Sequence, residues 1–599
     1  MSVHLIDLCT DIFYFIVLKS KSKKMQLLYI WIKNYKCLND VEMNFCEYPR
    51  FKFDKERNTL CQISMIKPER TIFPSDEFSC IENISVIAGS NGSGKTTVCS
   101  LIRELICNEN FSSSEYIIVW KANNKILYKS NLTDLQIHAE LTLAFEQFKQ
   151  PMFDSNLRVV YYSPHYSISF PFMEPIGMQR RFIDCSTSFV LKNDVTKYKS
   201  SVNQLTANKI QDFYRCVSFY SNKDFIEKIK DKNGDKIFKL GTNLPESLLF
   251  SIDDKVINLF KKEVLSKKEF HNLNEVFNII MGFTRFSENK SKKEAFKEHC
   301  VITIFCSYFL DFFRIQKKTQ IMNVIDILIG AAGNKLQNYN YVADYVYAFF
   351  EQFLPILKTE DEHNIFLEKC NTIKWFLRCI EDIYESHFRN KTLKLSFKDD
   401  FKTIKELYSI YQRIVEVTDF GIFELSPELS AGETSEALLY GRLLEGLDEV
   451  KHNKTYEHVL LFLDEVEITL HPQLQRQLIL NLCVFLQAFY KELKFQIIFA
   501  THSPILLSDI PKSNVILLQK KEGDSFSVIK ESENNTFACN IGEMFYDHFF
   551  MTETIGAFAK NEILKALELI KEGKRDEAKC IIEYVGDDLF KEILTNKLD

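Results

Sequence analysis

The sequence lacks the cysteine pattern of a zinc site. Its 16 cysteines are scattered from Cys9 to Cys580, with no C-x-x-C pair and no His/Cys cluster at zinc-ligand spacing. We expect most of them to be buried thiols in a reducing compartment, which indicates a cytoplasmic protein. A strong charge imbalance is also missing. The net charge of −6 argues against a surface coated uniformly for nucleic acid, while local basic patches that contact DNA or another nucleic acid stay open.

Long hydrophobic runs are missing as well. The N-terminal apolar run extends only over Ile12–Leu18, far short of the roughly 20 residues that span a bilayer. Acidic residues precede this run, and a lysine-rich stretch stands where a signal peptide would have its cleavage site. We therefore expect no membrane association. We interpret residues 1–24 as an N-terminal extension outside the folded core and regard Met25 as a candidate start of the folded part.

Glycine and proline are scarce, with 18 and 13 in 599 residues, and they are sparse in the middle of the chain. Residues 191–405 show helical periodicity, for example over Val342–Leu357 and Asn364–Ser386, without sustained heptads. The missing heptads argue against a long coiled-coil arm. We predict a packed helical insertion over 191–405, within a chain whose length favours roughly two to four domains.

What the sequence does contain is a phosphate-binding loop. The stretch GSNGSGKT fits G-x-x-x-x-G-K-[ST], follows an apolar strand at Ile84–Ala88 and precedes helical spacing over Val98–Leu105. Glycines let backbone N–H groups point at phosphates, and the helix N-terminus adds partial positive charge. Lys95 is predicted to reach the β- and γ-phosphates of ATP, and the Thr96 hydroxyl to bind Mg²⁺. The predicted nucleotide-binding residues of the loop are Gly89, Ser90, Asn91, Gly92, Ser93, Gly94, Lys95, Thr96 and Thr97.

Apolar strands return after the insertion. His458–Leu463, Phe495–Ala500 and Val515–Leu518 are predicted strands, and Pro472–Tyr490 is a predicted helix between the first two. Such strands indicate a parallel sheet covered by helices on both faces. Hairpin patterns around the phosphate loop predict an antiparallel N-terminal lobe. The hairpin strands are Leu27–Ile32, Val41–Phe45, Tyr116–Trp120 and Lys125–Tyr128. The predicted fold is α/β, a mostly parallel sheet with an antiparallel lobe, split by the insertion.

Polar side chains stand at the ends of two of these strands. Asp464 is suited to hold Mg²⁺ through water, and Glu465 is placed to polarise an attacking water. An acidic pair that caps the strand is the alternative interpretation. His502 ends the next strand, where sheets of this kind place their ligand groups, and it is a candidate sensor of the γ-phosphate. We interpret Glu467 as a solvated or structural acid.

The stretch Leu429–Glu433 precedes a predicted helix at Thr434–Leu447. Ser430 and Gly432 at a helix N-terminus form a second anion site, which needs a second role because the phosphate loop already covers the nucleotide. An ordinary helix N-cap is the default interpretation of the pentapeptide alone.

The motifs GSNGSGKTT, LSAGE, LLFLDEVE and FATHSP resemble, in order and context, the ABC-type ATPases, particularly the SMC-like, overcoming-lysogenization-like and DNA-repair branch. In that family two ATPase heads clamp two nucleotides. The resemblance implies that Ser430 and Gly432 bind the γ-phosphate held by another copy, with Ala431 replacing the first glycine of the usual signature pair. It also implies that Glu465 is the catalytic base and His502 the switch histidine.

The family's Q-loop glutamine has no distinctive counterpart in this sequence. Gln136, Gln147 and Gln150 all lie in the interval where it is expected.

A narrower resemblance covers about 25–190 and 410–599. LLYIWIKNYKCLNDVEMNF, DEVEITLHPQLQRQLI, FATHSPILLSDIPKSNVILL and TFACNIGEMFYDHFFMTETIGAFAKNEI look like the ATPase subunit of Septu-type or retron-associated anti-phage systems. The resemblance implies a sensor or scaffold ATPase that works with a separately encoded HNH-type nuclease. It also implies homodimers or larger assemblies joined through ATP-sandwiched heads.

We expect no nuclease site in this chain, because Asp587 and Asp588 form the only acidic cluster after the ATPase motifs and lack further acids for two metals. Two alternatives remain, an SMC-like repair ATPase acting directly on DNA and a scaffold in which ATP only fixes assembly. The predicted divisions of the chain are 1–24, 25–190 with the phosphate loop, 191–405 as the insertion, 406–540 with the remaining ATPase motifs, and 541–599 as a C-terminal helical segment.

Overall fold

The fold is that of a computed structural model, and not every residue is described. The described residues are 25–63, 77–107, 111–122, 125–138, 144–147, 157–166, 182–197, 204–222, 245–267, 274, 277, 291–315, 371, 374–389, 391–415, 421–452, 457–520, 527–530, 535–542, 544 and 555–598. The predicted extension over 1–24 and the predicted helix over Val342–Leu357 lie outside them.

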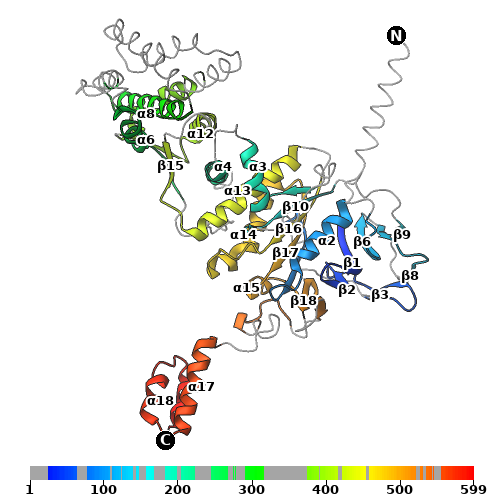
Figure 1. The fold of residues 1–599 in the computed structure, drawn as a ribbon. Helices are drawn as coiled ribbons and strands as arrows, with labels where there is room; N and C mark the ends of the chain where they lie inside the picture. The colour runs from blue at the N-terminus through cyan, green and yellow to red at the C-terminus, as the bar shows by residue number, and fades with distance from the viewer. Residues whose placement is uncertain are drawn as a thin grey trace, which may run out of the picture.

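A twelve-stranded sheet forms the centre of the molecule (Figure 1). One half runs in the order β11-β10-β16-β17-β5-β18, and all five of its strand pairs are parallel. β5, which leads into the phosphate loop, lies between two strands from the far end of the chain. The bounds are β11 Phe182–Asp184, β10 Leu157–Tyr162, β16 His458–Asp464, β17 Lys494–Thr501, β5 Ile81–Gly89 and β18 Val515–Lys520.

The other half of this sheet is mainly antiparallel and forms the N-terminal lobe. Its order is β19-β2-β1-β6-β7-β9, with parallel pairing only between β19 and β2 and between β7 and β9. The bounds are β19 Ser527–Lys530, β2 Leu38–Asn44, β1 Met25–Tyr35, β6 Tyr116–Ala122, β7 Lys125–Ser130 and β9 Ala144–Gln147. A small sheet of β3 Phe51–Asp54, β4 Thr59–Gln62 and β8 Gln136–His138 packs beside the lobe. The predicted α/β fold is confirmed.

Helices cover both faces of the parallel half, because its strands are apolar on both sides. Leu461 and Leu463 of β16 face one core, and Leu460 and Phe462 face the other. The first core contains α13 Ala431–His452, α14 Pro472–Tyr490 and α15 Pro504–Leu507. The second contains α2 Lys95–Cys107, which packs between the parallel strands and the antiparallel lobe. The phosphate loop and the acidic strand end therefore stand at one edge of a rigid sheet.

The insertion contains a sheet as well as helices, which differs from the predicted all-helical segment. Its strand order is β13-β14-β12-β15, entirely antiparallel. Phe250 of β12 packs against Phe296, Phe376 and Phe423, which joins the sheet to its helices. The elements are α3 Thr187–Thr196, α4 Gln204–Tyr220, β12 Ser247–Ile252, α6 Lys255–Phe260, η2 Lys261–Leu265, α8 Lys292–Ile315, η6 Glu385–His387, β13 Phe388–Arg389, β14 Thr392–Ser396, α12 Phe401–Val415 and β15 Gly421–Ser426.

The insertion also runs further than residue 405. The side chain of Tyr411 in α12 packs on Phe250 and Phe423, and β15 pairs with β12 along its whole length. This sheet was not predicted from the sequence, because its strands are short, and apolar and polar residues do not alternate regularly along them. Their burial depends on distant partners. β15 ends at Ser426, directly before the Leu429–Glu433 motif.

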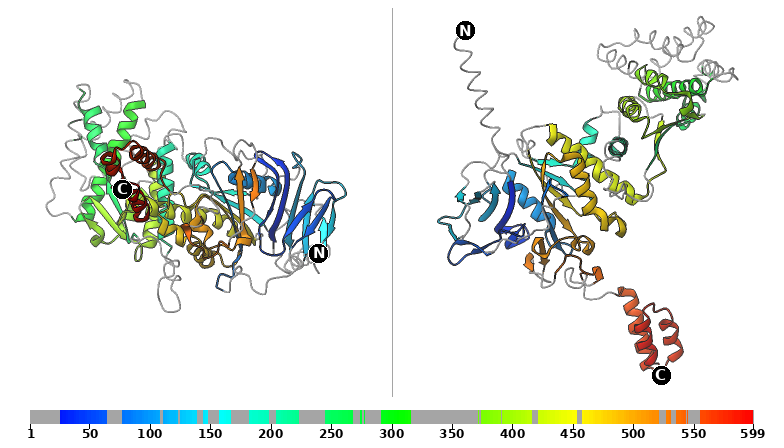
Figure 2. Two further views of the ribbon diagram at one scale, coloured as in Figure 1. Left: turned by 90° about the horizontal axis from the view of Figure 1, so that it is seen from below. Right: turned by 180° about the vertical axis from the view of Figure 1, so that it is seen from behind.

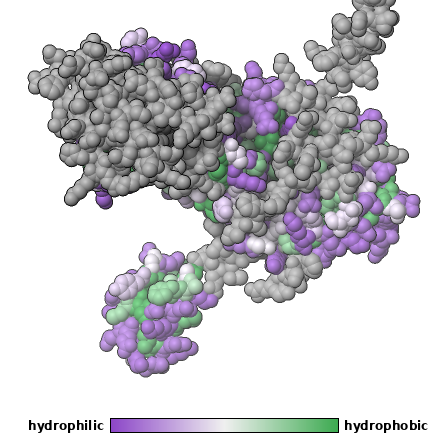
Figure 3. All heavy atoms as spheres, turned by 45° about the horizontal axis from the view of Figure 1, so that its top comes forward, coloured by the Kyte–Doolittle hydropathy of each residue, from purple (hydrophilic) through white to green (hydrophobic). Residues whose placement is uncertain are grey.

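Three C-terminal helices share a small core of their own around Ala566, Ile582 and Leu594. They are α17 Ala557–Lys571, α18 Arg575–Ile582 and α19 Asp588–Asn596, and the remaining short helix η7 spans Lys512–Asn514. Figure 2 draws them apart from the central sheet, and Figure 3 shows hydrophobic side chains on their surface. Phe558 and Tyr584 are the most exposed of these.

The cysteines of the described residues are free thiols, and most of them are buried. Within the same residues no helix combines the length and the apolar character that crossing a bilayer requires.

Candidate nucleotide-binding and hydrolysis site

The phosphate loop leaves β5 at Gly89 and enters α2 at Lys95. Gly89 needs the absence of a side chain, since a Cβ there would stand 2.2 Å from the carbonyl oxygen of Leu518. Gly94 has a φ of 95°, a conformation that residues with a side chain rarely adopt. The hydroxyl of Ser93 is fully buried without a hydrogen-bond partner among the described residues. A turn with an unsatisfied donor inside it is suited to an anionic ligand.

Lys95 is the buried cation of the site. Its Nζ donates to the carbonyl oxygens of Gly89 and Ser90 at 3.2 and 3.3 Å, lies 2.5 Å from Nε2 of His502 and 4.0 Å from Oε1 of Glu465. Burial lowers the pKa of Lys95 from 10.5 to about 8, although Glu465 and the neighbouring acids oppose the shift. The Lys95 amine is thus buried inside the loop, and the acids around it do not fully offset the cost of burying its charge.

Thr96 and Asp464 meet across the sheet edge. Oγ1 of Thr96 donates to Oδ2 of Asp464 at 3.0 Å, and the hydroxyl of Tyr161 in β10 donates to the same oxygen at 3.0 Å. Burial raises the pKa of Asp464, and Tyr161, Thr96 and Lys95 only partly offset this. Oδ1 of Asp464 is buried without a hydrogen-bond partner among the described side chains. A threonine hydroxyl beside a carboxylate with an unused oxygen fits Mg²⁺ and its bound waters.

Glu465 stands directly after the strand in a left-handed conformation, with a φ of 52°. Its N–H donates to the carbonyl oxygen of Ala500 at 2.8 Å, which holds the strained residue to β17. Its carboxylate lies 2.8 Å from Nε2 of His502 through Oε1 and 3.0 Å from Nε2 of His165 through Oε2. His502, followed by Lys95 and His165, lowers the pKa of Glu465 despite its partial burial. The group is therefore an ionised carboxylate, as a general base requires.

His502 is positioned by a second acid, Glu467. This carboxylate accepts hydrogen bonds from the Thr501 hydroxyl and from the His502 N–H, the latter at 3.1 Å. Glu467 is 3% exposed, and burial raises its pKa. The prediction that it is structural is confirmed, and the alternative that it is solvated is wrong. Asp464 pairs with Ala500 where the neighbouring strands β16 and β17 end, which brings both motifs together.

Ser430 and Gly432 lie at the start of α13 and are joined to the phosphate loop by none of the hydrogen bonds or ion pairs found among the described residues. Ser430 and Glu433 instead form a reciprocal cap: the Ser430 N–H donates to Oε2 of Glu433 at 2.9 Å, and the Glu433 N–H donates to the Ser430 hydroxyl at 3.3 Å. A Cβ at Gly432 would make only ordinary contacts, the nearest at 3.6 Å. Packing within this chain therefore does not explain the glycine.

The comparisons with known proteins fit this geometry. Residues 371–508 match the family model described as "AAA domain, putative AbiEii toxin, Type IV TA system". The matched segment contains Ser430, Asp464, Glu465 and His502, of which the last three contact Lys95 or Thr96 of the phosphate loop. This part of the site is therefore similar to an AAA domain.

No curated protein matches the chain. Among solved structures, the ATP-bound recombination mediator protein RecF of the RecFOR pathway matches over 85% of this chain and 100% of its own, at 12% identity and a TM-score of 0.22. A score this low supports no argument about activity.

Two side chains of this candidate site were not predicted from the sequence. Tyr161 lies inside a uniformly apolar strand, and His165 follows the end of that strand by a few residues. Tyr161 belongs to β10, which pairs with β16, and His165 lies in the loop that leaves β10. The rule that polar groups gather at the ends of parallel strands could have identified His165, but only once β10 was known to neighbour β16. Of the Q-loop candidates, Gln136 lies in β8 and Gln147 in β9, both exposed, and Gln150 lies outside the described residues.

Proposed function

We propose that the chain binds and hydrolyses ATP as an ABC-type ATPase that dimerises head to head, and that it regulates a separately encoded effector nuclease in anti-phage defence. The observation that supports hydrolysis is the convergence of Lys95, Thr96, Asp464, Glu465 and His502 beside one loop. These side chains come from three neighbouring parallel strands, and each has the chemistry that phosphoryl transfer to water needs.

The roles follow from charge and position. The loop amides and Lys95 bind the phosphates, and Thr96 and Asp464 hold Mg²⁺, which neutralises phosphate charge when bound. Glu465 accepts a proton from the attacking water. His502 contacts the γ-phosphate in place of the Glu465 oxygen that it now faces.

The proposed dimer rests on the position of the signature residues. Ser430 is exposed and Gly432 half-buried, and the nucleotide-binding loop of the same chain is not among their hydrogen-bonding partners. The N-terminus of α13 presents Ser430 together with Gly432, whose missing side chain is not required by packing among the described residues. Such a helix N-terminus is suited to bind an anion held by a second copy. The α13 helix follows β15 of the insertion, so movement of the insertion would reach this surface directly.

Replacing Glu465 by Gln tests the hydrolysis proposal. The variant should bind ATP with Mg²⁺ and slow phosphate release by about 100-fold or more, since an amide cannot accept the proton. Glu577→Gln, in the exposed first turn of α18, is the matched control and should hydrolyse at the wild-type rate. An E465Q variant that turns over ATP normally would remove Glu465 from the mechanism.

The defence role needs a separate test. The gene neighbourhood should contain a small HNH-type reading frame, and co-expression of the two should give a complex that cleaves nucleic acid only with an intact ATP site. DNA-stimulated, salt-sensitive hydrolysis without any such partner would favour the SMC-like repair alternative instead.

A further inference from the structure

The carboxylate of Glu465 is contacted on both of its oxygens by histidines. Nε2 of His502 lies 2.8 Å from Oε1, and Nε2 of His165 lies 3.0 Å from Oε2. The two contacts leave the carboxylate little freedom to rotate. His502 belongs to a predicted motif, whereas none of the motifs recognised in the sequence includes His165.

The sheet brings His165 to this position. β10 and β16 are parallel neighbours, with Tyr162 paired to Leu463 in the last register position. The loops that leave these two strands therefore start side by side at the same edge. One carries His165 and the other Glu465, so their contact follows from the strand order.

The backbone directly before His165 is held by Thr187 at the start of α3. The Ser163 carbonyl accepts from the Thr187 N–H at 2.9 Å, and the Thr187 hydroxyl donates to the Pro164 carbonyl at 2.8 Å. Arg442 of α13 donates to that same hydroxyl at 2.7 Å and forms an ion pair with Asp212 of α4. The His165 loop is thus fixed to the helix that carries the signature residues and to the first helices of the insertion.

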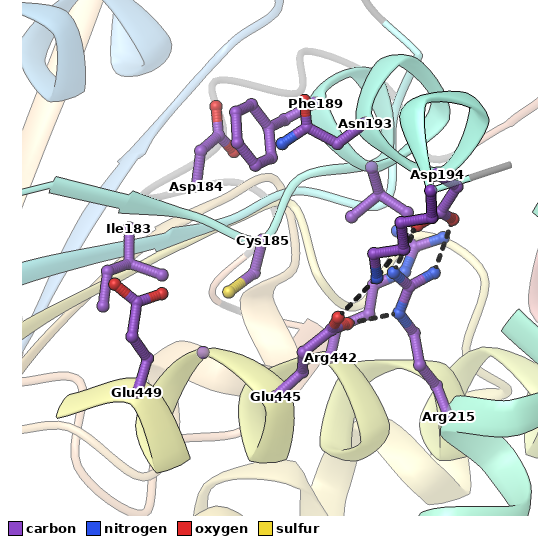
Figure 4. A pocket seen from close by; sticks show the side chains of 13 residues that line it. Ile183, Asp184, Cys185, Phe189, Asn193, Asp194, Arg215, Arg442, Glu445 and Glu449 are labelled. Atoms are coloured by element: carbon purple, nitrogen blue, oxygen red, sulfur yellow. Dashed lines mark hydrogen bonds and ion pairs between the residues drawn. The ribbon is translucent and has the colours of Figure 1, made fainter. Parts of the chain in front are cut away.

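Figure 4 shows the neighbouring part of this contact region, a cavity of about 240 Å³ between α3, α4 and α13. Arg215 there reaches Asp194 and Glu445, so that α13 is tied to both insertion helices. Four charged side chains of the cavity, Asp194, Lys197, Arg215 and Glu445, are paired with one another, which suits a rigid connection between helices better than a ligand site.

We propose that His165 is a positioning residue that orients Glu465 for catalysis. This inference rests on the proposed function. In the ATP-bound state, Lys95 and His502 contact phosphate, and His165 is then the histidine that still contacts the Glu465 carboxylate. Nε2 of His165 has no hydrogen-bond partner among the described residues, so its 3.0 Å contact with Oε2 is a close approach that a small reorientation of the ring would turn into a hydrogen bond. The free Oε1 then faces the water that the carboxylate activates.

The test compares His165→Ala and His165→Gln with the wild-type chain. We expect H165A to lower kcat for ATP hydrolysis by about 10- to 100-fold, since a misplaced catalytic group can lose that much. KM and ATP affinity should stay within about twofold, because the phosphate loop is untouched. H165Q, whose amide can donate to the same oxygen, should recover part of the rate. His138→Ala, at an exposed histidine of β8, is the matched control.

A double mutant separates positioning from a structural role. In the Glu465→Gln background, H165A should give no further loss, because there is no longer a base to orient. Equal losses in both backgrounds, or a wild-type kcat for H165A alone, would overturn the inference. Absence of hydrolysis by the wild-type chain would instead refute the proposed function, so the two failures are distinguishable.

Discussion

Several side chains at the candidate nucleotide site are buried with unsatisfied charge or hydrogen-bonding groups, which lowers folding stability and favours ligand binding. Lys95 is 4% exposed and has a lowered pKa, Asp464 has a raised pKa, and Ser93 keeps an unsatisfied hydroxyl. Each of these groups is better accommodated with a phosphate or a magnesium ion beside it. Binding sites commonly carry such a stability deficit.

Lys95→Met should therefore stabilise the nucleotide-free protein while weakening ATP binding. The shift of the Lys95 pKa from 10.5 to about 8 corresponds to about 3 kcal/mol of destabilisation below pH 8. Between pH 8 and 10.5 the folded state loses this proton first, so wild-type stability rises with pH and the advantage of K95M shrinks. Denaturant unfolding at pH 7 and pH 10.5 measures the difference.

ATP affinity of K95M should fall roughly 10- to 100-fold, the equivalent of one or two hydrogen bonds to a charged group. Titration calorimetry with Mg²⁺ and ATP measures this. Lys125→Met, at an exposed strand position, should change neither quantity. A variant destabilised at pH 7 would contradict the assigned burial of the lysine.

At the scale of elements, α13 connects the site to the insertion. Arg215 of α4 is 3% exposed and forms ion pairs with Asp194 of α3, which is fully buried, and with Glu445 of α13. A short aromatic sheet of the insertion then leads through β15 into the signature residues. These ion pairs therefore hold α13 to the helices α3 and α4 of the insertion.

Arg215→Met should destabilise the protein by about 3–5 kcal/mol, because it leaves Asp194 buried and unpaired. Thermal or chemical unfolding measures the change. Lys197→Met removes an exposed member of the same ion-pair group and should change stability by less than about 1 kcal/mol. Replacing Asp194 by Leu together with R215M should recover much of the loss. Similar small effects for both single variants would show that the network carries no stability.

At the scale of the whole molecule, one chain supplies both halves of the proposed dimeric site on different surfaces. The phosphate loop stands at the sheet edge, and Ser430 caps an exposed helix start. In a closed symmetric dimer, the phosphate loop of each copy can face the Ser430 surface of the other copy, so that the two surfaces meet at two equivalent places.

Mixing two inactive variants tests this arrangement. Ser430→Arg should bind ATP normally but lose hydrolysis, and K95M should lose binding. Random pairing of equal amounts should restore about a quarter of the wild-type rate, because half of the dimers are mixed and each carries one complete site. Steady-state phosphate release measures the restoration. Hydrolysis by S430R alone at the wild-type rate would refute the role of Ser430 in a second copy.

The sequence by itself determined the features that local spacing encodes. The phosphate loop and the helix Pro472–Tyr490 were predicted at their observed positions, since glycine geometry and apolar periodicity act within a few residues. The candidate residues Asp464, Glu465 and His502 followed from the rule that strand ends carry ligand groups.

Only the tertiary structure decided which strands are neighbours. The order β10-β16-β17-β5 brought Tyr161 and His165 onto Asp464 and Glu465, and buried Glu467 beneath His502. The sheet of the insertion, and its end at Ser426 instead of 405, likewise depend on pairing between strands far apart in the chain. Such pairing satisfies backbone hydrogen bonds across long sequence distances, and no local pattern of residues specifies it.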